Sequence, residues 1–148
     1  MRLSKYRAYQ DKEDKNWFWF ESIGLKGTIT KAVVFEELPE PNRFNLGMGD
    51  YNETKGEVDD INFTNNGDAR KVFATIGEIV KAYTGLHPER EIFITGNTIG
   101  KKDIYSIMVS AFLTEINNEF NIWGANVGGE YETFRKDKIY DAILVKRK

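Results

Sequence analysis

The chain has 148 residues, no cysteine and a formal net charge of −2. This length is typical of one domain, and we expect a single domain over residues 1–148. With 41% hydrophobic and 30% charged residues, the composition is that of a folded protein and excludes a disordered chain. The lack of cysteine excludes disulfides, thiolate metal sites and cysteine nucleophiles, and it favours a reducing compartment.

The N-terminal residues are charged and lack the apolar stretch of a secretory signal. No later run approaches the ~20 apolar residues of a membrane span. We therefore expect a cytoplasmic protein that does not enter a membrane. The near-neutral total charge argues against a nucleic-acid partner, although residues 146–148 form a small basic end. His87 is the only histidine, so no metal site is predicted.

The first part of the chain predicts an antiparallel meander of strands. Residues 16–21 are aromatic, residues 28–36 are rich in branched side chains, and residues 44–48 alternate between apolar and polar. A turn-rich segment follows, and a less regular fourth strand is marked by the apolar residues Val58, Ile61 and Phe63.

The period then changes to that of an amphipathic helix. Its apolar stripe consists of Val72, Ile76, Ile79, Val80 and Tyr83. A short strand at residues 91–95 separates it from a second helix with the stripe Ile104, Ile107, Met108, Ala111, Phe112 and Ile116. Strands are predicted again at residues 119–123, 130–134 and 139–145. We predict an α+β fold: one twisted, mostly antiparallel sheet of about six or seven strands with two main helices packed against it.

The start of the first helix is a candidate anion site. The unpaired amides of a helix N-terminus favour an anion, Gly67 would allow a close approach, and Arg70 and Lys71 would add positive charge. The alternative is that Asn66 or Asp68 simply caps the helix.

A similar loop, residues 95–102 with Lys101 and Lys102, precedes the second helix. If the preceding strands are neighbours, both loops lie at one sheet edge, where α/β sheets bind ligands. Neither loop matches a dinucleotide-binding or P-loop motif, so the expected ligand is a small anion rather than a nucleotide undergoing hydrolysis.

The aromatic strand places Trp17 and Trp19 on one face and Phe18 and Phe20 on the other. Such a strand is either buried on both faces or covered by a partner subunit, which suggests a homodimer. Exposed aromatic rings would also suit base stacking by a nucleic-acid-binding module. The acidic residues of the following turn are interpreted as a solvated rim rather than a cation site; they are Asp50, Glu53, Glu57, Asp59 and Asp60.

Several segments together resemble an uncharacterised protein family of Bacteroidetes bacteria, and the resemblance covers nearly the whole chain. They are residues 49–52, 58–60, 64–68, 71–76, 95–98, 104–105 and 140–146. This resemblance implies a bacterial protein and no particular activity.

The order of elements from Glu57 onward also resembles the GNAT acyltransferase superfamily. In that superfamily a loop of the pattern Gln/Arg-x-x-Gly-x-Gly/Ala holds the acyl-CoA pyrophosphate; here Thr64, Gly67 and Ala69 take the matching positions. Ile104-Tyr105 resembles the superfamily's Leu-Tyr pair, which would make Tyr105 a general acid, with Arg70, Lys71 and Lys101 supplying charge. Thr64 departs from the usual Gln or Arg, and the helical pair between the first two strands is absent.

These observations favour a non-catalytic binding or accessory domain without a cofactor, whose partner is an unknown protein, a second copy of the chain or a small anionic ligand. One alternative is a divergent GNAT-like N-acyltransferase that uses acyl-CoA. The other is a nucleic-acid-binding module.

Overall fold

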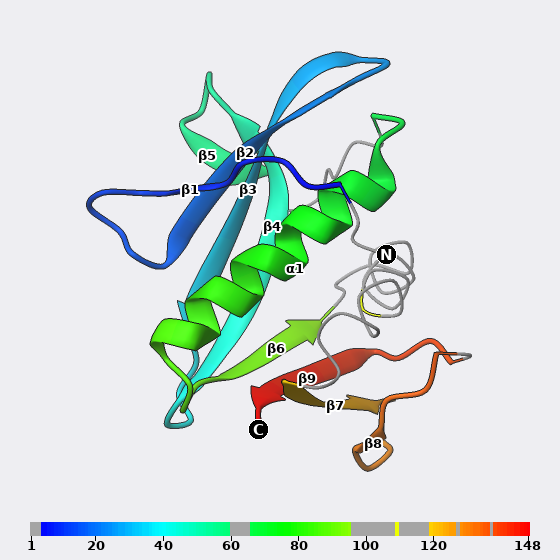
Figure 1. Ribbon diagram of the computed structural model, residues 1–148. Helices are drawn as coiled ribbons and strands as arrows, with labels where there is room; N and C mark the ends of the chain where they lie inside the picture. The colour runs from blue at the N-terminus through cyan, green and yellow to red at the C-terminus, as the bar shows by residue number, and fades with distance from the viewer. Residues whose placement is uncertain (1–3, 60–65, 96–108, 110–118, 127, 137) are drawn as a thin grey trace.

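The computed structural model of the chain describes residues 4–59, 66–95, 109, 119–126, 128–136 and 138–148. The strands within these residues form one nine-stranded mixed sheet in the order β1-β2-β3-β4-β6-β9-β7-β8, with β5 paired to β4 (Figure 1). In chain order the elements are β1 (Tyr9–Gln10), β2 (Trp17–Gly24), β3 (Gly27–Glu37), β4 (Arg43–Asn52), β5 (Glu57–Asp59), α1 (Ala69–Leu86), β6 (Glu91–Thr95), β7 (Phe120–Ala125), β8 (Glu132–Thr133) and β9 (Ala142–Arg147).

Strands β2, β3 and β4 are the longest of the sheet and form a continuous antiparallel meander. A tight turn joins β2 to β3, with Gly24 paired to Gly27. The backbone φ of Gly27 is +89°, a left-handed conformation that an L side chain rarely adopts. The register pairs Phe18 with Val33 and Val33 with Met48, so one face of the meander is apolar.

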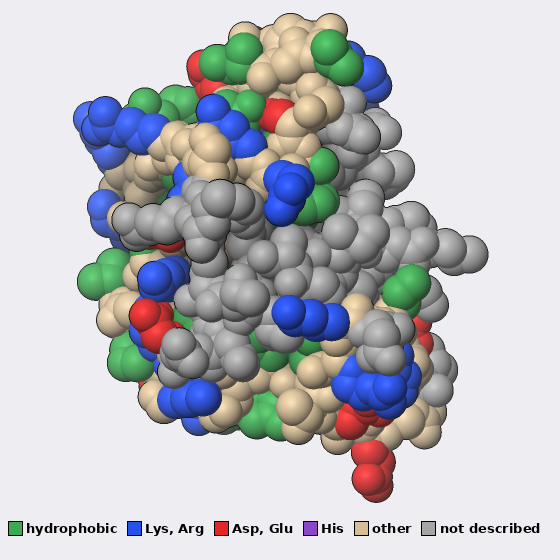
Figure 2. Space-filling view, turned by 45° about the vertical axis from the view of Figure 1, so that its right-hand side comes forward, with side chains coloured by type: hydrophobic (Ala, Val, Ile, Leu, Met, Phe, Trp, Pro, Cys, Tyr) green, Lys and Arg blue, Asp and Glu red, His purple; other side chains and the backbone are tan. Residues whose placement is uncertain are grey.

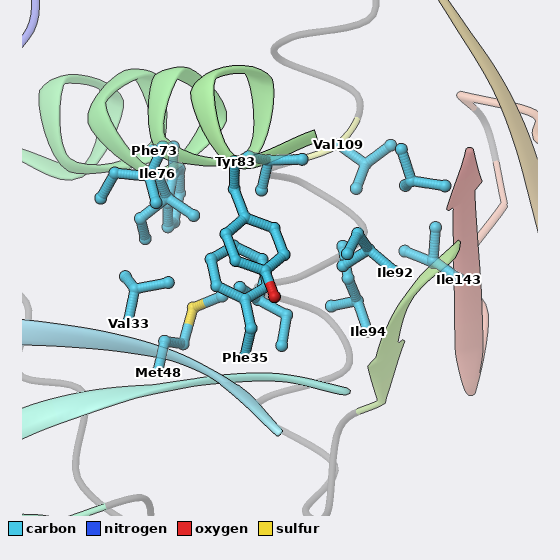
Figure 3. Close-up of a cluster of buried hydrophobic side chains, with 14 of the residues drawn as sticks. Val33, Phe35, Met48, Phe73, Ile76, Tyr83, Ile92, Ile94, Val109 and Ile143 are labelled. Carbon is cyan, nitrogen blue, oxygen red and sulfur yellow. The ribbon is translucent and has the colours of Figure 1, made fainter. Parts of the chain in front are cut away.

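Helix α1 packs diagonally across this apolar face, which we call the helix face of the sheet (Figure 1). Its predicted stripe is confirmed, since every residue of the stripe is buried. In Figure 3 the side chain of Tyr83 lies among strand residues; its ring is stacked on that of Phe35, with 3.8 Å between the ring centres. The helices within the described residues are not long and apolar enough to cross a bilayer.

One charged pair is buried on the helix face. The Lys31 side chain is 1% exposed, and its ammonium group donates a hydrogen bond of 2.5 Å to the carboxylate of Asp50. Because a buried charge without a counter-ion is costly, each of these charges offsets part of the cost of burying the other. Lys31 and Asp50 face each other across β3 and β4, directly beyond the apolar rows.

The two halves of the sheet meet at a short seam. Strands β4 and β6 are parallel and pair over three residue positions, from Arg43–Glu91 to Asn45–Phe93. Further along, β4 pairs with β5 instead. The second half, β6-β9-β7-β8, is antiparallel. Helix α1 lies in the chain between β4 and β6 and connects the halves.

The structure corrects the predicted architecture. The sheet has nine strands rather than six or seven, its parallel β4–β6 pair makes it mixed, and the described residues contain one main helix rather than two. Strands β1, β5 and β8 have only two or three residues, too few to show a periodicity in the sequence. The predicted second helix lies outside the described residues except for the buried Val109. The nine-stranded sheet and the single helix of the described residues contradict the predicted GNAT-like architecture.

Candidate functional site

The face of the sheet opposite α1, which we call the opposite face, carries a different set of side chains. Alternation along β2 directs Phe18 and Phe20 into the core, where they are 7% and 0% exposed. It directs Trp17, Trp19 and Glu21 to the opposite face, where both tryptophans are only half-buried. Among the described residues, the one long helix, α1, lies on the helix face and not on this one (Figure 1).

A cleft of about 550 Å³ lies on the opposite face at the β1–β2 end of the sheet. The residues that line it come from three successive strands and two turns. They are Asp11, Asp14, Trp17, Trp19, Glu21, Thr30, Tyr51, Glu53 and Gly56. The volume is within the range of small-molecule binding sites, about 300–1,000 Å³.

Two aromatic rings form adjoining walls of the cleft. The centres of the Trp17 and Tyr51 rings are 5.7 Å apart, and their planes meet at 86°. Trp19 continues this surface, and it is held from the edge strand by Tyr9, whose ring is stacked on it at 4.5 Å. Aromatic rings that line one cleft are the surfaces that recognise alkylammonium groups in aromatic cages.

The charge of the cleft is entirely negative among its described lining residues. Four carboxylates line it, whereas no lysine, arginine or histidine does; the four are Asp11, Asp14, Glu21 and Glu53. Within the part of the chain that the structure describes, none of the four forms an ion pair with a basic side chain. These carboxylates beside the aromatic walls give the cleft a negative potential that favours a cation.

The β1–β2 turn that carries two of these carboxylates has a defined shape. The Asp11 carboxylate accepts hydrogen bonds from the amides of Glu13 at 3.1 Å and Asp14 at 2.9 Å. The Asp14 carboxylate accepts one from the amide of Asn16 at 3.0 Å. Such side-chain to backbone bonds are typical of Asp in turns, and they fix both carboxylates at the rim of the cleft.

At the start of α1, where the anion site is predicted, the residues next to the helix contact the β2–β3 turn. Gly67 has a φ of +80°, and a Cβ atom on it would lie 3.0 Å from the Leu25 side chain. The buried Asn66 accepts a hydrogen bond from the amide of Lys26 at 2.6 Å and donates one to the carbonyl of Gly27 at 2.8 Å. This loop therefore joins the helix start to the β2–β3 turn.

The neighbouring Asp68 also holds the start of α1 against β2 and the N-terminal segment. It is the N-cap residue of α1, one of the two positions expected from the sequence, but its side chain makes no capping hydrogen bond. Its carboxylate instead accepts hydrogen bonds from the hydroxyls of Tyr6 at 2.5 Å and Ser22 at 2.6 Å. Burial and the neighbouring Asp68 raise the pKa of Tyr6, which keeps its hydroxyl protonated as the donor.

The basic residues predicted for the anion site do not converge on one point. Ala69 and Arg70 are exposed in the first turn of α1, whereas the Lys71 ammonium lies over the Tyr6 ring, 4.2 Å from its centre. Thr64, Lys101 and Tyr105 lie outside the described residues. Pyrophosphate binding by the Gly67 and Ala69 amides, and acid catalysis by Tyr105, stay predictions.

The acidic residues of positions 50–60 do not all belong to one solvated rim, as the sequence suggested. Asp50 is paired with Lys31 on the helix face, whereas Glu53 lines the cleft. The described residues hold no group of three or more Asp, Glu or His side chains arranged to bind a metal ion.

The sequence contains part of the evidence for the cleft, since alternation along one strand places Trp17, Trp19 and Glu21 on the same face. It does not show that Tyr51, from another strand, contacts Trp17.

The protein therefore combines a mixed sheet, the helix α1 on one face of it and an acidic aromatic cleft on the other. The chain belongs to a family of unknown function, DUF6934, whose pattern it matches over residues 2–148. No curated protein and no solved structure matches the chain. The comparisons therefore give no support to the resemblance to GNAT acyltransferases or to an origin in Bacteroidetes.

Proposed function

We propose that this protein is a non-catalytic binding domain that takes the positively charged group of an organic cation into the cleft on the opposite face. The observation that carries the proposal is the right-angled pair of Trp17 and Tyr51 rings, 5.7 Å apart, in a cleft whose described charged residues are all acidic. This ligand has the opposite charge to the small anion expected from the sequence.

The energetics favour a cation over a neutral guest. A cation over an aromatic face gains about 0.5–1 kcal/mol when exposed and about 2 kcal/mol when desolvated. Exposed carboxylates add long-range attraction that salt screens over about 8–10 Å. A neutral molecule of the same shape gains only the apolar contact with the rings, because it carries no charge for the four carboxylates to attract.

Binding rather than chemistry is supported by the residue types in the cleft. Among its described lining residues there is no histidine, lysine or serine, so a hydroxyl nucleophile paired with a histidine or lysine base is missing from this set. Asp11 and Asp14 already use carboxylate oxygens to hold their own turn.

Calorimetric titration with choline tests the proposal. Choline should bind about tenfold more tightly than its uncharged isostere, in which carbon replaces the nitrogen, since one such cation–π contact contributes about 1–2 kcal/mol. Binding should weaken as sodium chloride is raised, because the carboxylates become screened. Equal affinity for choline and the isostere would contradict the proposal.

A matched pair of tryptophan variants locates the site. Trp17→Ala removes one wall of the cleft and should weaken choline binding about tenfold. Trp123→Ala removes a half-buried tryptophan of β7 that does not line the cleft, and it should leave choline binding unchanged. A similar loss in both variants would place the binding elsewhere.

A further inference from the structure

We infer that the natural ligand is a linear dication whose two positive charges are separated by a hydrocarbon chain of about eight to ten carbons, bound lengthwise along β2. The inference rests on the proposed function and specifies the chemistry of its ligand. It follows from the positions of the carboxylates, which lie at both ends of an aromatic floor rather than around one point.

The first acidic end is level with Trp17. The amide of Asp11 donates a hydrogen bond of 2.8 Å to the carbonyl of Trp17, which places these two residues side by side in the β1–β2 hairpin. Asp14 lies in the turn beyond them. This end therefore combines the Trp17 ring with two carboxylates.

The second acidic end is four residues further along the same strand. Trp17, Trp19 and Glu21 all point to the opposite face, and a strand advances about 3.3 Å per residue, so Glu21 lies about 13 Å from the level of Trp17. Glu53, in the turn between β4 and β5, also lines the cleft. It follows Tyr51, which the register of β4 places level with Glu21: Glu21 pairs with Thr30, and the neighbouring Lys31 pairs with Asp50.

The floor between the two ends is aromatic. Trp19 lies between Trp17 and Glu21 on the strand, and the Tyr51 ring extends back from the Glu21 end to contact Trp17. Among the described residues, no basic side chain lines this floor. A chain of methylene groups matches such a surface, because it buries apolar area against the rings without requiring hydrogen bonds.

The distance between the ends sets the length of the ligand. An extended chain of single bonds advances about 1.2 Å per bond, as the three backbone bonds of an extended residue show. A separation of about 13 Å therefore needs about ten bonds between the two nitrogens, less when the carboxylates lean inward. Free diamines and two tethered lysine side chains share this chemistry.

The test compares octylamine with diaminooctane by calorimetry on the full-length chain. Both carry the same hydrocarbon, but only the diamine can place a charge at each end. Diaminooctane should bind about fivefold more tightly than octylamine, since an exposed ion pair contributes up to about 1 kcal/mol. Diaminopropane, which is too short to reach both ends, should bind no more tightly than propylamine.

Variants at the second end supply the matched control. The double variant Glu21→Gln with Glu53→Gln should abolish the preference for diaminooctane, so that the two amines bind with equal affinity. Glu89→Gln, at an exposed loop position that does not line the cleft, should preserve the preference for the diamine. A peptide with two lysines that competes with diaminooctane more strongly than free diamines would identify the source of the charges as a protein.

The outcomes separate the two proposals. A preference for diaminooctane that the double variant abolishes supports the dication. Equal binding of octylamine and diaminooctane, with both lost in Trp17→Ala, overturns the dication and leaves the cation-binding proposal standing. Failure of choline, octylamine and diaminooctane alike overturns both.

Discussion

The two faces of strand β2 carry the same kind of residue and serve different purposes. On the helix face, Phe18 and Phe20 are buried among the strands and α1. On the opposite face, Trp17 and Trp19 are half-buried and line a cleft. The comparison shows that an aromatic run in a strand does not distinguish core from site. Whether aromatic side chains become core or site depends on the element that packs over their face of the sheet. Here α1 covers only one of the two faces.

The largest expected effect is a loss of stability when the core on the helix face is disrupted. Replacing Phe35 with Ala removes a ring that is 1% exposed and stacked on Tyr83. The loss should lower the free energy of unfolding by about 3–5 kcal/mol, through lost burial and the remaining cavity. Urea unfolding measures it, and an effect below that of an ordinary surface substitution would contradict the described core.

The next effect concerns the buried charge pair. Asp50→Asn removes the carboxylate that is hydrogen-bonded to the buried Lys31 ammonium, and it should cost about 3 kcal/mol. The double variant Lys31→Met with Asp50→Leu removes both charges and should recover most of the stability, because the apolar pair needs no counter-ion. Urea midpoints of the single and double variants give the answer; equal destabilisation in both would show that the charge itself is not the cause.

A smaller stability effect is expected on the opposite face. Trp17→Ala removes a half-buried ring and should cost only about 1–2 kcal/mol of unfolding free energy. Its main consequence should be the loss of cation binding. A destabilisation as large as that of Phe35→Ala would mean that the opposite face is core, and the difference between the faces would disappear.

The smallest effect is a pH dependence at the far edge of the sheet. Hydrogen bonds from Lys138 at 2.9 Å and Tyr140 at 2.9 Å lower the pKa of Glu132. A lowered pKa in the folded state contributes stability that is present above the ordinary glutamate pKa and is lost as the pH falls through the lowered value. Glu132→Gln should therefore be less stable than the natural chain at neutral pH, and the gap should close in acid.

Urea midpoints measured at neutral pH and at successively lower pH values test this prediction. Glu130→Gln, two residues away and exposed, is the control and should show no such closing gap. A gap that stays constant with pH would exclude the Glu132 carboxylate as its cause.

The sequence predicted the structure best where a periodic pattern of apolar residues repeats several times. The stripe of α1 and the alternation over residues 43–48 of β4 both predicted the buried side chains, since each pattern repeats its period several times. The short strands β1, β5 and β8 and the parallel β4–β6 pair were not predictable, because two or three residues show no period and pairing partners are not encoded locally.

The candidate site was harder to predict than the fold. The loop at Gly67 has the composition of an anion site, yet Asn66 and Asp68 are engaged with the β2–β3 turn and with Tyr6. The cleft depends instead on Tyr51 meeting Trp17 across two strand pairings, a long-range contact that no motif reveals. The predicted homodimer through the aromatic strands and the predicted cytoplasmic location stay predictions.

The short seam between β4 and β6 has a consequence for local unfolding. Three residue pairs are few ladder bonds to hold two sheet halves, so amide hydrogen exchange should divide the molecule into two cooperative units at this line. Every described residue that lines the cleft falls between positions 11 and 56, within the first unit. A ligand bound there would slow exchange in β1 to β5 and leave the opening of β6 to β9 largely untouched, because only the unit that holds the ligand gains its binding free energy.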